Sequence, residues 1–271
     1  MFKALDLSFS RIPDVSWCAR RIAEGFTVAF QCLWTGGYAL NNGLREVATH
    51  NLRLWRESGG FPAAYLNASP ADWWSPEISL AEAKMNAGVE WDNLAVVVVD
   101  VEIDGVGEYE VRYTLELVEA EGKRTCIYTA YWFWVGYLGN PTWPWLLSYK
   151  LWNAYYDGDP DIDYDSRPYG VWTSANLLGE QWQGTTDLEG VEVDLNQVIL
   201  DASFFQSSVS PVPPSVPVPH GQPIYYFVES GDYASLIATR FNLSLEEFEN
   251  LNGGPTARNW NLIYVGEQFI V

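Results

Sequence analysis

The chain has 271 residues, of which 48% are hydrophobic, and a formal net charge of −20. That length allows a large core together with a small second module. Because binding to phosphate requires basic patches, the negative charge argues against nucleic acid and anionic membrane surfaces as partners.

The few cysteines and histidines exclude several kinds of site. Cys18, Cys32 and Cys126 lie in segments of apolar periodicity, which predicts buried thiols rather than a disulfide framework. His50 and His220 have no partner at ligand spacing, so neither a zinc site nor a Ser-His-Asp triad is indicated. No apolar run approaches the ~20 residues of a membrane span.

Alternating strand and helix patterns fill the first two thirds of the chain. Strands are predicted at 3–9, 27–34, 61–68, 94–102 and 125–130, and helices at 13–25, 44–58, 79–87 and 109–120. Three further strands, at 150–156, 177–184 and 191–199, are predicted to follow with short connections. This order predicts an α/β fold with a parallel sheet, and eight strands are enough to close a barrel.

The most apolar of these strands, LAVVVVDVE at 94–102, ends in Asp100 and Glu102. Side chains at i and i+2 share one side of a strand, so the two carboxyls are expected about 6–7 Å apart. In barrel enzymes the C-terminal strand ends carry the catalytic groups, and a carboxyl pair suits acid/base or nucleophilic chemistry. The alternative interpretation is a solvated strand end with two ordinary surface acids.

The last quarter of the chain, from residue 206, changes character. Residues 206–223 contain six prolines and no charge, which predicts an extended, semi-rigid linker. Residues 224–271 then predict strand, helix, helix, strand, and Ser244 with Glu247 forms a capping box for the second helix.

This C-terminal module resembles a LysM domain in its ESGDYASLIATRFNLSLEEFENLN run and its NLIYVGEQFIV ending. The resemblance implies binding of the N-acetylglucosamine units of peptidoglycan or chitin, between the loop after the first strand and the loop before the second. The glycan contacts that it implies are Gly231, Asp232, Tyr233, Asn252, Leu262 and Ile263.

Residues 2–205 resemble glycoside hydrolase family 25, the lysozymes (N-acetylmuramidases) that are often found in phage endolysins. KALDLS, with Asp6, resembles the family's opening Gly-x-Asp-x-Ser, although Ala4 replaces the Gly, and VVVDVE carries the family's Asp-x-Glu. IYTAYWFW resembles the fifth-strand motif. LWNAYY, EQWQG and VEVDLN match the closing strands and contain Trp152, Gln183 and Asp194. The segment QCLWTGG departs from the family pattern.

The resemblance implies cleavage of the β-1,4 bond from N-acetylmuramic acid to N-acetylglucosamine in bacterial peptidoglycan. Glu102 is expected to be the general acid, and Asp100 to support the oxocarbenium ion, either by orienting the substrate's 2-acetamido group or as a direct nucleophile. Asp6 and Asp194 are expected to complete an acidic cluster that keeps Glu102 protonated. Tyr65, Trp152 and Gln183 are the expected sugar contacts, with core packing as the alternative for Tyr65 and Trp152.

Two other functions remain open at the sequence level: a chitinase-like N-acetylglucosaminidase and a non-catalytic protein that binds cell-wall glycan. The chitinase motif Asp-x-x-Asp-x-Asp-x-Glu has acids where this chain has Ala95 and Val98. DGDPDIDYD at 157–165 has the alternating acids of a calcium loop, but Pro160 interrupts it, so we expect a solvated loop, no metal and no cofactor.

The expected partner is peptidoglycan, and the expected state is a monomer that acts on the bacterial cell wall. A strand pattern starts at Lys3 without a signal peptide before it. We therefore expect either a phage lysin released from the host cytoplasm or a secreted enzyme whose leader has been removed.

Overall fold

The computed structural model describes residues 1–36, 43–70, 74–199 and 202–206, and in the C-terminal region 225–228, 234, 237–238, 243–254, 258, 260, 263–264 and 267–270. The chain divides into two compact units, residues 1–211 and 212–271. Within the described part of the chain, no helix has both the length and the apolar character needed to cross a membrane.

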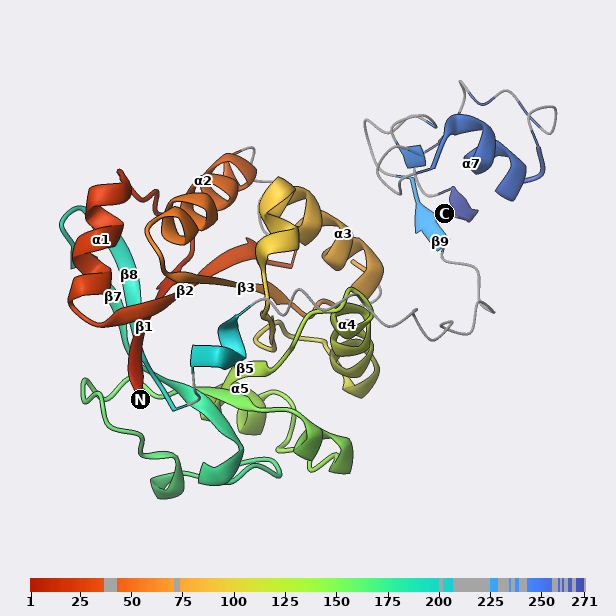
Figure 1. The fold of residues 1–271 in the computed structure, drawn as a ribbon. Helices are drawn as coiled ribbons and strands as arrows, with labels where there is room; N and C mark the ends of the chain where they lie inside the picture. The colour runs from red at the N-terminus through yellow and green to blue at the C-terminus, as the bar shows by residue number, and fades with distance from the viewer. Residues whose placement is uncertain are drawn as a thin grey trace. The chain divides into compact units, whose positions relative to one another are not determined.

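The first unit is a closed barrel whose eight strands follow one another in chain order (Figure 1). The strands are β1 (Phe2–Leu7), β2 (Phe26–Trp34), β3 (Phe61–Asn67), β4 (Val97–Asp100), β5 (Ile127–Ala130), β6 (Leu151–Ala154), β7 (Leu177–Leu188) and β8 (Val191–Val198). The helices are α1 (Val15–Ala23), α2 (Leu44–Glu57), α3 (Pro76–Ala87), α4 (Glu108–Ala120) and α5 (Tyr131–Gly136). The predicted barrel of five βα units and three further strands is confirmed.

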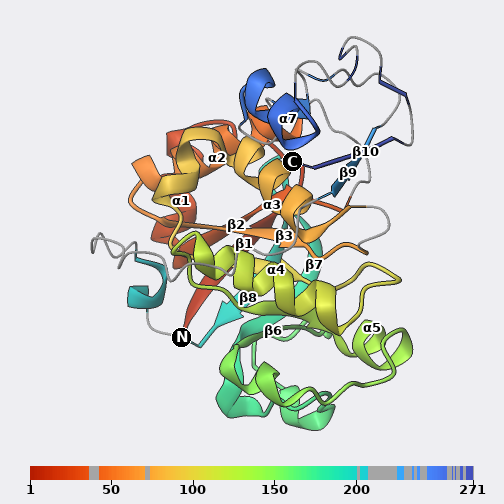
Figure 2. The same ribbon diagram turned by 90° about the vertical axis from the view of Figure 1, so that its right-hand side faces the viewer.

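The helices lie around the outside of the barrel, and Figure 2 shows α2, α3 and α4 side by side there. Their starts follow from local capping. The Asp14 side chain accepts a hydrogen bond from the backbone of Trp17 at 2.8 Å and thereby begins α1. Ser75 caps α3 and Pro76 occupies its first turn, so this helix begins three residues before the predicted Ser79.

The last strand runs opposite to the others. The strands β1 to β7 run parallel to one another, as predicted. The prediction of a parallel sheet was wrong for β8, which is antiparallel to both β7 and β1. Glu189 and Gly190 join β7 to β8 with φ angles of 58° and 84°. Such a two-residue turn forms a hairpin and is far too short for the crossover that a parallel strand requires.

The connection between β6 and β7 is long, and the prediction of short connections among the last three strands was wrong here. Because β6 and β7 are parallel, the chain must return from one end of the barrel to the other. Residues 155–176 make this return with two short 3₁₀ turns, Tyr164–Ser166 and Ser174–Asn176. Tyr164, Tyr169 and Trp172 are buried and attach the connection to the barrel wall.

Aromatic side chains fill the middle of the barrel. The rings of Phe30 and Trp152 stack with their centroids 4.2 Å apart. Phe205, from a 3₁₀ turn at Ala202–Phe205, lies 5.8 Å from the ring of Phe30 and 5.8 Å from that of Phe2. This packed layer excludes water below the C-terminal strand ends and gives the polar groups above it a rigid base. The three cysteines are buried and unpaired, as predicted.

In the C-terminal unit, β9 (Tyr225–Phe227) pairs antiparallel with β10 (Gln268–Ile270). The helix α7 (Leu245–Leu251) begins with the predicted capping box, in which Ser244 and Glu247 each bind the other's backbone N–H. The rings of Phe248, Trp260 and Phe269 pack against one another. Of the predicted first helix, Ala234, Ile237 and Ala238 are described as helical and buried. The predicted linker beyond Gln206 lies outside the described residues.

Candidate active site

Four carboxyl groups meet at the mouth of the barrel, where the parallel strands end. Asp6 of β1 lies directly opposite Asp194 of β8 in the strand register. Asp100 is the last residue of β4, and Glu102 follows two residues later. The charges of Asp194 and Glu102 act on Asp6, and those of Glu102 and Asp6 act on Asp100. The structure therefore brings together the four acids that the sequence predicted.

Burial and mutual repulsion disfavour the charged forms of these acids. The pKa of Asp6 is well above its usual value because the carboxyl is buried and faces Asp194, although hydrogen bonds with Tyr65 and Gln181 oppose the shift. The pKa of Asp100 is also well above its usual value, from burial and then from the charge of Glu102. A hydrogen bond with Asn67 acts in the opposite direction on Asp100.

Glu102 is the most accessible member of the Asp100–Glu102 pair. Its side chain is half-buried, whereas Asp100 is 7% exposed. Burial raises the pKa of Glu102 to about 7. Since neighbouring carboxyls release their protons in two steps that belong to the pair, Asp100 and Glu102 together retain a proton near neutral pH. This is the state that proton donation to a bound ligand requires.

Gln181 of β7 connects the acids with two tyrosines. Its Nε2 donates to Oδ2 of Asp194 at 2.8 Å and to Oδ2 of Asp6 at 3.1 Å. Its Oε1 accepts from the hydroxyl of Tyr128 at 2.5 Å and from that of Tyr156 at 2.8 Å. Sequence reasoning missed this residue and selected Gln183 in the same motif.

A β-bulge explains why Gln181 and Gln183 differ. Strict alternation would place both side chains on the same face of β7. The register between β7 and β8 shifts between them, so that Gln181 pairs with Asn196 and Gln183 with Leu195. The Gln183 side chain is half-buried and donates to the carbonyl of Gly184 at 2.9 Å. It makes no hydrogen bond to the acids.

The two aromatic residues predicted as sugar contacts occupy different positions. Tyr65, at the end of β3, has its hydroxyl 3.1 Å from Oγ of Ser8 and also hydrogen-bonded to Asp6, so it borders the acids. Trp152 is 1% exposed; its ring stacks on Phe30, and its Nε1 donates to Asn196 at 2.8 Å. Trp152 is thus part of the floor below the acids and has no face open to a ligand in this conformation.

Tyr156 is a residue at the mouth that sequence reasoning did not select. Tyr156 is 54% exposed, yet its hydroxyl donates a hydrogen bond to Gln181 and lies 3.1 Å from the hydroxyl of Tyr128. A ring that is fixed at its polar end and open on its face suits a hydrophobic contact with a ligand.

The acidic loop at 157–165 uses its carboxylates locally. The Asp157 side chain accepts from the backbone of Asp159 at 2.9 Å, and the Asp159 side chain accepts from the backbone of Asp161 at 3.2 Å. These are turns in which Asp binds the chain two residues ahead. Among the described residues, no group of three or more His, Cys, Asp or Glu side chains is arranged to hold a metal ion.

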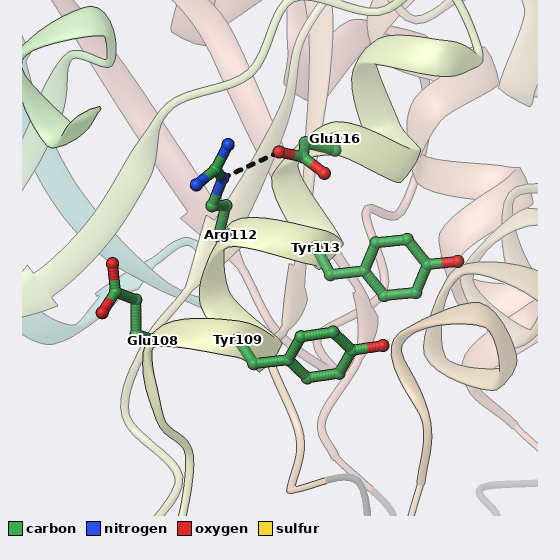
Figure 3. A pocket seen from close by; sticks show the side chains of 5 residues that line it. All are labelled: Glu108, Tyr109, Arg112, Tyr113 and Glu116. Atoms are coloured by element: carbon green, nitrogen blue, oxygen red, sulfur yellow. Dashed lines mark hydrogen bonds and ion pairs between the residues drawn. The ribbon is translucent and has the colours of Figure 1, made fainter. Parts of the chain in front are cut away.

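A pocket of about 440 Å³ lies elsewhere, on the outward face of α4 (Figure 3). Tyr109 and Tyr113 stack there with ring centroids 5.4 Å apart, and Arg112 donates to Glu116 at 2.8 Å. All five lining residues, which include Glu108, come from this one helix, and none of them belongs to the acidic cluster.

Comparison with known proteins agrees with this architecture, although no family model matches the sequence. A curated relative from Dictyostelium discoideum, a probable GH family 25 lysozyme 3, is 26% identical over 205 residues, which cover 71% of this chain. The aligned part is only 40% of the length of that relative.

Solved structures share the barrel at low sequence identity. A muramidase from Acremonium alcalophilum has a TM-score of 0.54 at 16% identity, covering 76% of this chain and 97% of its own. A glycosyl hydrolase 25 of Streptococcus pneumoniae has a TM-score of 0.52 at 14% identity, covering 72% and 87%. A family 25 glycosyl hydrolase from Bacillus anthracis has a TM-score of 0.52 at 15% identity, covering 76% and 92%. The barrel therefore has the fold of the family 25 glycosyl hydrolases.

Proposed function

We propose that the barrel is a peptidoglycan hydrolase, a lysozyme that cleaves the β-1,4 bond between N-acetylmuramic acid and N-acetylglucosamine. The observation that carries the proposal is the Asp100–Glu102 pair at the end of β4, with the pKa of Glu102 raised to about 7 beside Asp6 and Asp194. The shared fold and the similarity to a probable lysozyme support the same reaction.

In this mechanism Glu102 donates its proton to the glycosidic oxygen while the bond from that oxygen to the sugar's anomeric carbon breaks. Asp100 lies deeper and supports the positive charge that develops on the sugar ring. It acts either by orienting the 2-acetamido group or as the nucleophile, and water then supplies the hydroxyl at the anomeric carbon. The charges of Asp6 and Asp194 help the cluster retain its proton.

The open face of Tyr156 is the best-placed sugar contact, with Tyr65 beside the acids and Gln183 at the edge of the mouth. Trp152 supports this surface from below through its contacts with Tyr65, Tyr128 and Phe30. A glycan that enters the mouth would then lie over aromatic surface with the carboxyls on one side.

The test is digestion of purified peptidoglycan, followed by borohydride reduction and identification of the new reducing ends. We expect new muramitol from the wild type and a loss of about 10²- to 10⁴-fold in Glu102→Gln. Glu116→Gln is the matched control, because Glu116 is paired with Arg112 on the outer face of α4. New glucosaminitol would instead identify an N-acetylglucosaminidase. If the wild type releases no new reducing ends, the protein binds glycan without cleaving it.

We also propose that the C-terminal unit is a LysM-like module that holds the chain on bacterial cell walls. The antiparallel β9–β10 pair and the capped helix α7 support this proposal. Gly231, Asp232, Tyr233 and Leu262 lie outside the described residues. Ile263 is half-buried, whereas Asn252 binds backbone atoms of Phe248 and Ile270, so its amide stabilises the unit.

Tethering by such a module raises the effective concentration of the barrel at the wall, although the charge of −20 opposes approach to anionic wall polymers. Co-sedimentation of full-length Glu102→Gln with insoluble peptidoglycan measures this retention without digestion. We expect soluble N-acetylglucosamine oligomers to compete, and added salt to strengthen the binding because it screens the repulsion.

A further inference from the structure

Gln181 is buried at the centre of the site, and all hydrogen-bonding positions of its side chain are occupied by other residues of the protein. Its relative exposure is 0%. A side-chain amide offers two N–H donors and two acceptor positions on its oxygen. Here the donors meet Asp6 and Asp194, and the oxygen receives the hydroxyls of Tyr128 and Tyr156. No hydrogen-bonding position is left for a sugar.

The partners also fix the orientation of the amide. A carboxyl oxygen can accept a hydrogen bond and a tyrosine hydroxyl can donate one, so all four partners are satisfied when the nitrogen of Gln181 faces Asp6 and Asp194. The opposite orientation would place the amide oxygen against two carboxylate oxygens. With the nitrogen so placed, the amide oxygen receives both tyrosine hydroxyls, and each of the four partners is held in one arrangement.

We propose that Gln181 is a positioning residue: its hydrogen bonds hold Asp6, Asp194, Tyr128 and Tyr156 in the arrangement that the reaction requires. The proposal rests on the hydrolase function proposed above. On one side the amide holds the Asp6–Asp194 pair at the barrel closure. On the other it holds Tyr128, which is the register partner of Asp100 in β5. It also holds the rim residue Tyr156.

Loss of the amide changes both sides of the mouth. Without the shared donor, Asp6 and Asp194 face each other with only Tyr65 and the Thr185 backbone as remaining donors, so their pKa values rise further. Without the acceptor, the Tyr156 hydroxyl keeps only its contact with the Tyr128 hydroxyl at 3.1 Å, so the ring is held less firmly. The titratable groups that face this network from the elements packed against it are Asp6, Cys32, Tyr65, Asp100, Glu102, Tyr128, Tyr156, Glu192 and Asp194.

The first test compares Gln181→Met with Gln197→Met on peptidoglycan. Gln197 is a half-buried glutamine on the neighbouring strand β8. Its register partners are Lys3 in β1 and Glu180 in β7, and it is not part of the Gln181 network. We expect Gln181→Met to lower kcat about 10- to 100-fold with KM within about threefold, since small misplacements of catalytic groups have effects of this size. We expect the acidic limb of its pH profile to move to higher pH. Gln197→Met should stay within about twofold.

Gln181→Glu separates positioning from the filling of space, because it preserves the shape and the acceptor but removes the donors. We expect it to be less active than Gln181→Met at neutral pH and to recover as the pH falls and the new carboxyl gains a proton. Tyr156→Phe removes one partner on an exposed ring without threatening the fold, and should lower kcat several-fold. Wild-type kcat and an unmoved pH profile in Gln181→Met and Gln181→Glu would overturn the proposal.

A second readout does not depend on catalysis. Carbon-13 NMR of aspartate-labelled protein, assigned with Asp6→Asn and Asp194→Asn, gives the titration of the two carboxyls directly. We expect both to titrate at higher pH in Gln181→Met than in the wild type. Unchanged titration contradicts the role of Gln181 even if the enzyme is active. If wild type releases no reducing ends, the hydrolase proposal fails while this titration still decides the role of Gln181.

Discussion

Two acids with similarly raised pKa values lie in different surroundings on opposite sides of the barrel wall. Glu102, at the mouth, and Glu180, on β7 below the β6–β7 connection, both have pKa values raised to about 7 by burial. Glu102 is half-buried and faces other carboxyls. Glu180 is 0% exposed and accepts a hydrogen bond from Asn153 at 2.7 Å.

The surroundings of Glu180 are those of a structural group. Asn153 receives the hydroxyl of Tyr169 at 2.8 Å, and that hydroxyl also lies 3.1 Å from the carbonyl of Thr129. The backbone of Asp163 also donates to Glu180. These bonds attach the β6–β7 connection to the barrel wall. A raised pKa therefore does not by itself identify a catalytic acid, since Asp157 and Asp163 also raise the pKa of Glu180; access to a ligand makes the difference.

The largest expected difference between the two regions is in reaction rate. Asp100→Asn should lower kcat about 10²- to 10⁴-fold, because in the proposed mechanism the carboxylate that supports the developing positive charge is lost. Its free energy of unfolding should not fall, because the substitution removes a buried charge that Glu102 and Asp6 repel. Reducing-end release and thermal unfolding on the same preparations measure both quantities.

Glu180→Gln is the control from the other side of the wall, and its rate should stay within about threefold of wild type. A loss of rate in Glu180→Gln as large as that in Asp100→Asn would show that the distinction between the two regions is mistaken. A marked loss of stability in Asp100→Asn would show that this carboxyl holds the barrel together.

The sequence predicted most of the barrel, because its apolar periodicity and glycine stops are local properties. The acids were predictable for a related reason: Asp100 and Glu102 interrupt an apolar strand at its end. Gln181 was not, because a β-bulge separates it from Gln183 only once β7 and β8 have paired. The place of Trp152 in the floor depends on barrel closure, which brings it onto Phe30.

A second difference between the acids appears in the dependence on pH. In the proposed mechanism Glu102 must be protonated to act, so kcat/KM should fall about tenfold per pH unit above about pH 7, in wild type and in Glu180→Gln alike. The raised pKa of Glu180 means that the folded protein binds this proton more tightly than the unfolded chain does. Its contribution to stability is therefore complete below about pH 4.5 and is lost as the pH rises through about 7.

This loss amounts to at most about 3 kcal/mol, and Glu180→Gln should remove that part of the slope. Urea unfolding at a series of pH values from 4.5 to 8 measures it. The comparison is contradicted if Glu180→Gln moves the basic limb of the rate profile, or if its stability has the same pH slope as that of wild type.

The smallest expected effect concerns Tyr169, which holds Asn153 and thereby Glu180. Tyr169→Phe removes one buried hydroxyl and leaves the ring, so the free energy of unfolding should fall by about 1 kcal/mol. The rate should stay within about twofold, because among the described residues the Tyr169 hydroxyl bonds only to Asn153 and to the carbonyl of Thr129.

Tyr137→Phe is the matched control for this substitution, because Tyr137 is 58% exposed and should be unaffected in both stability and rate. Urea denaturation and reducing-end release measure the pair. If Tyr169→Phe slows the reaction several-fold at unchanged stability, the β6–β7 connection transmits its arrangement to Tyr156 and thus to the mouth. The hydrogen bonds around Glu180 on the outer face of β7 would then be coupled to those around Gln181 on its inner face, instead of acting independently.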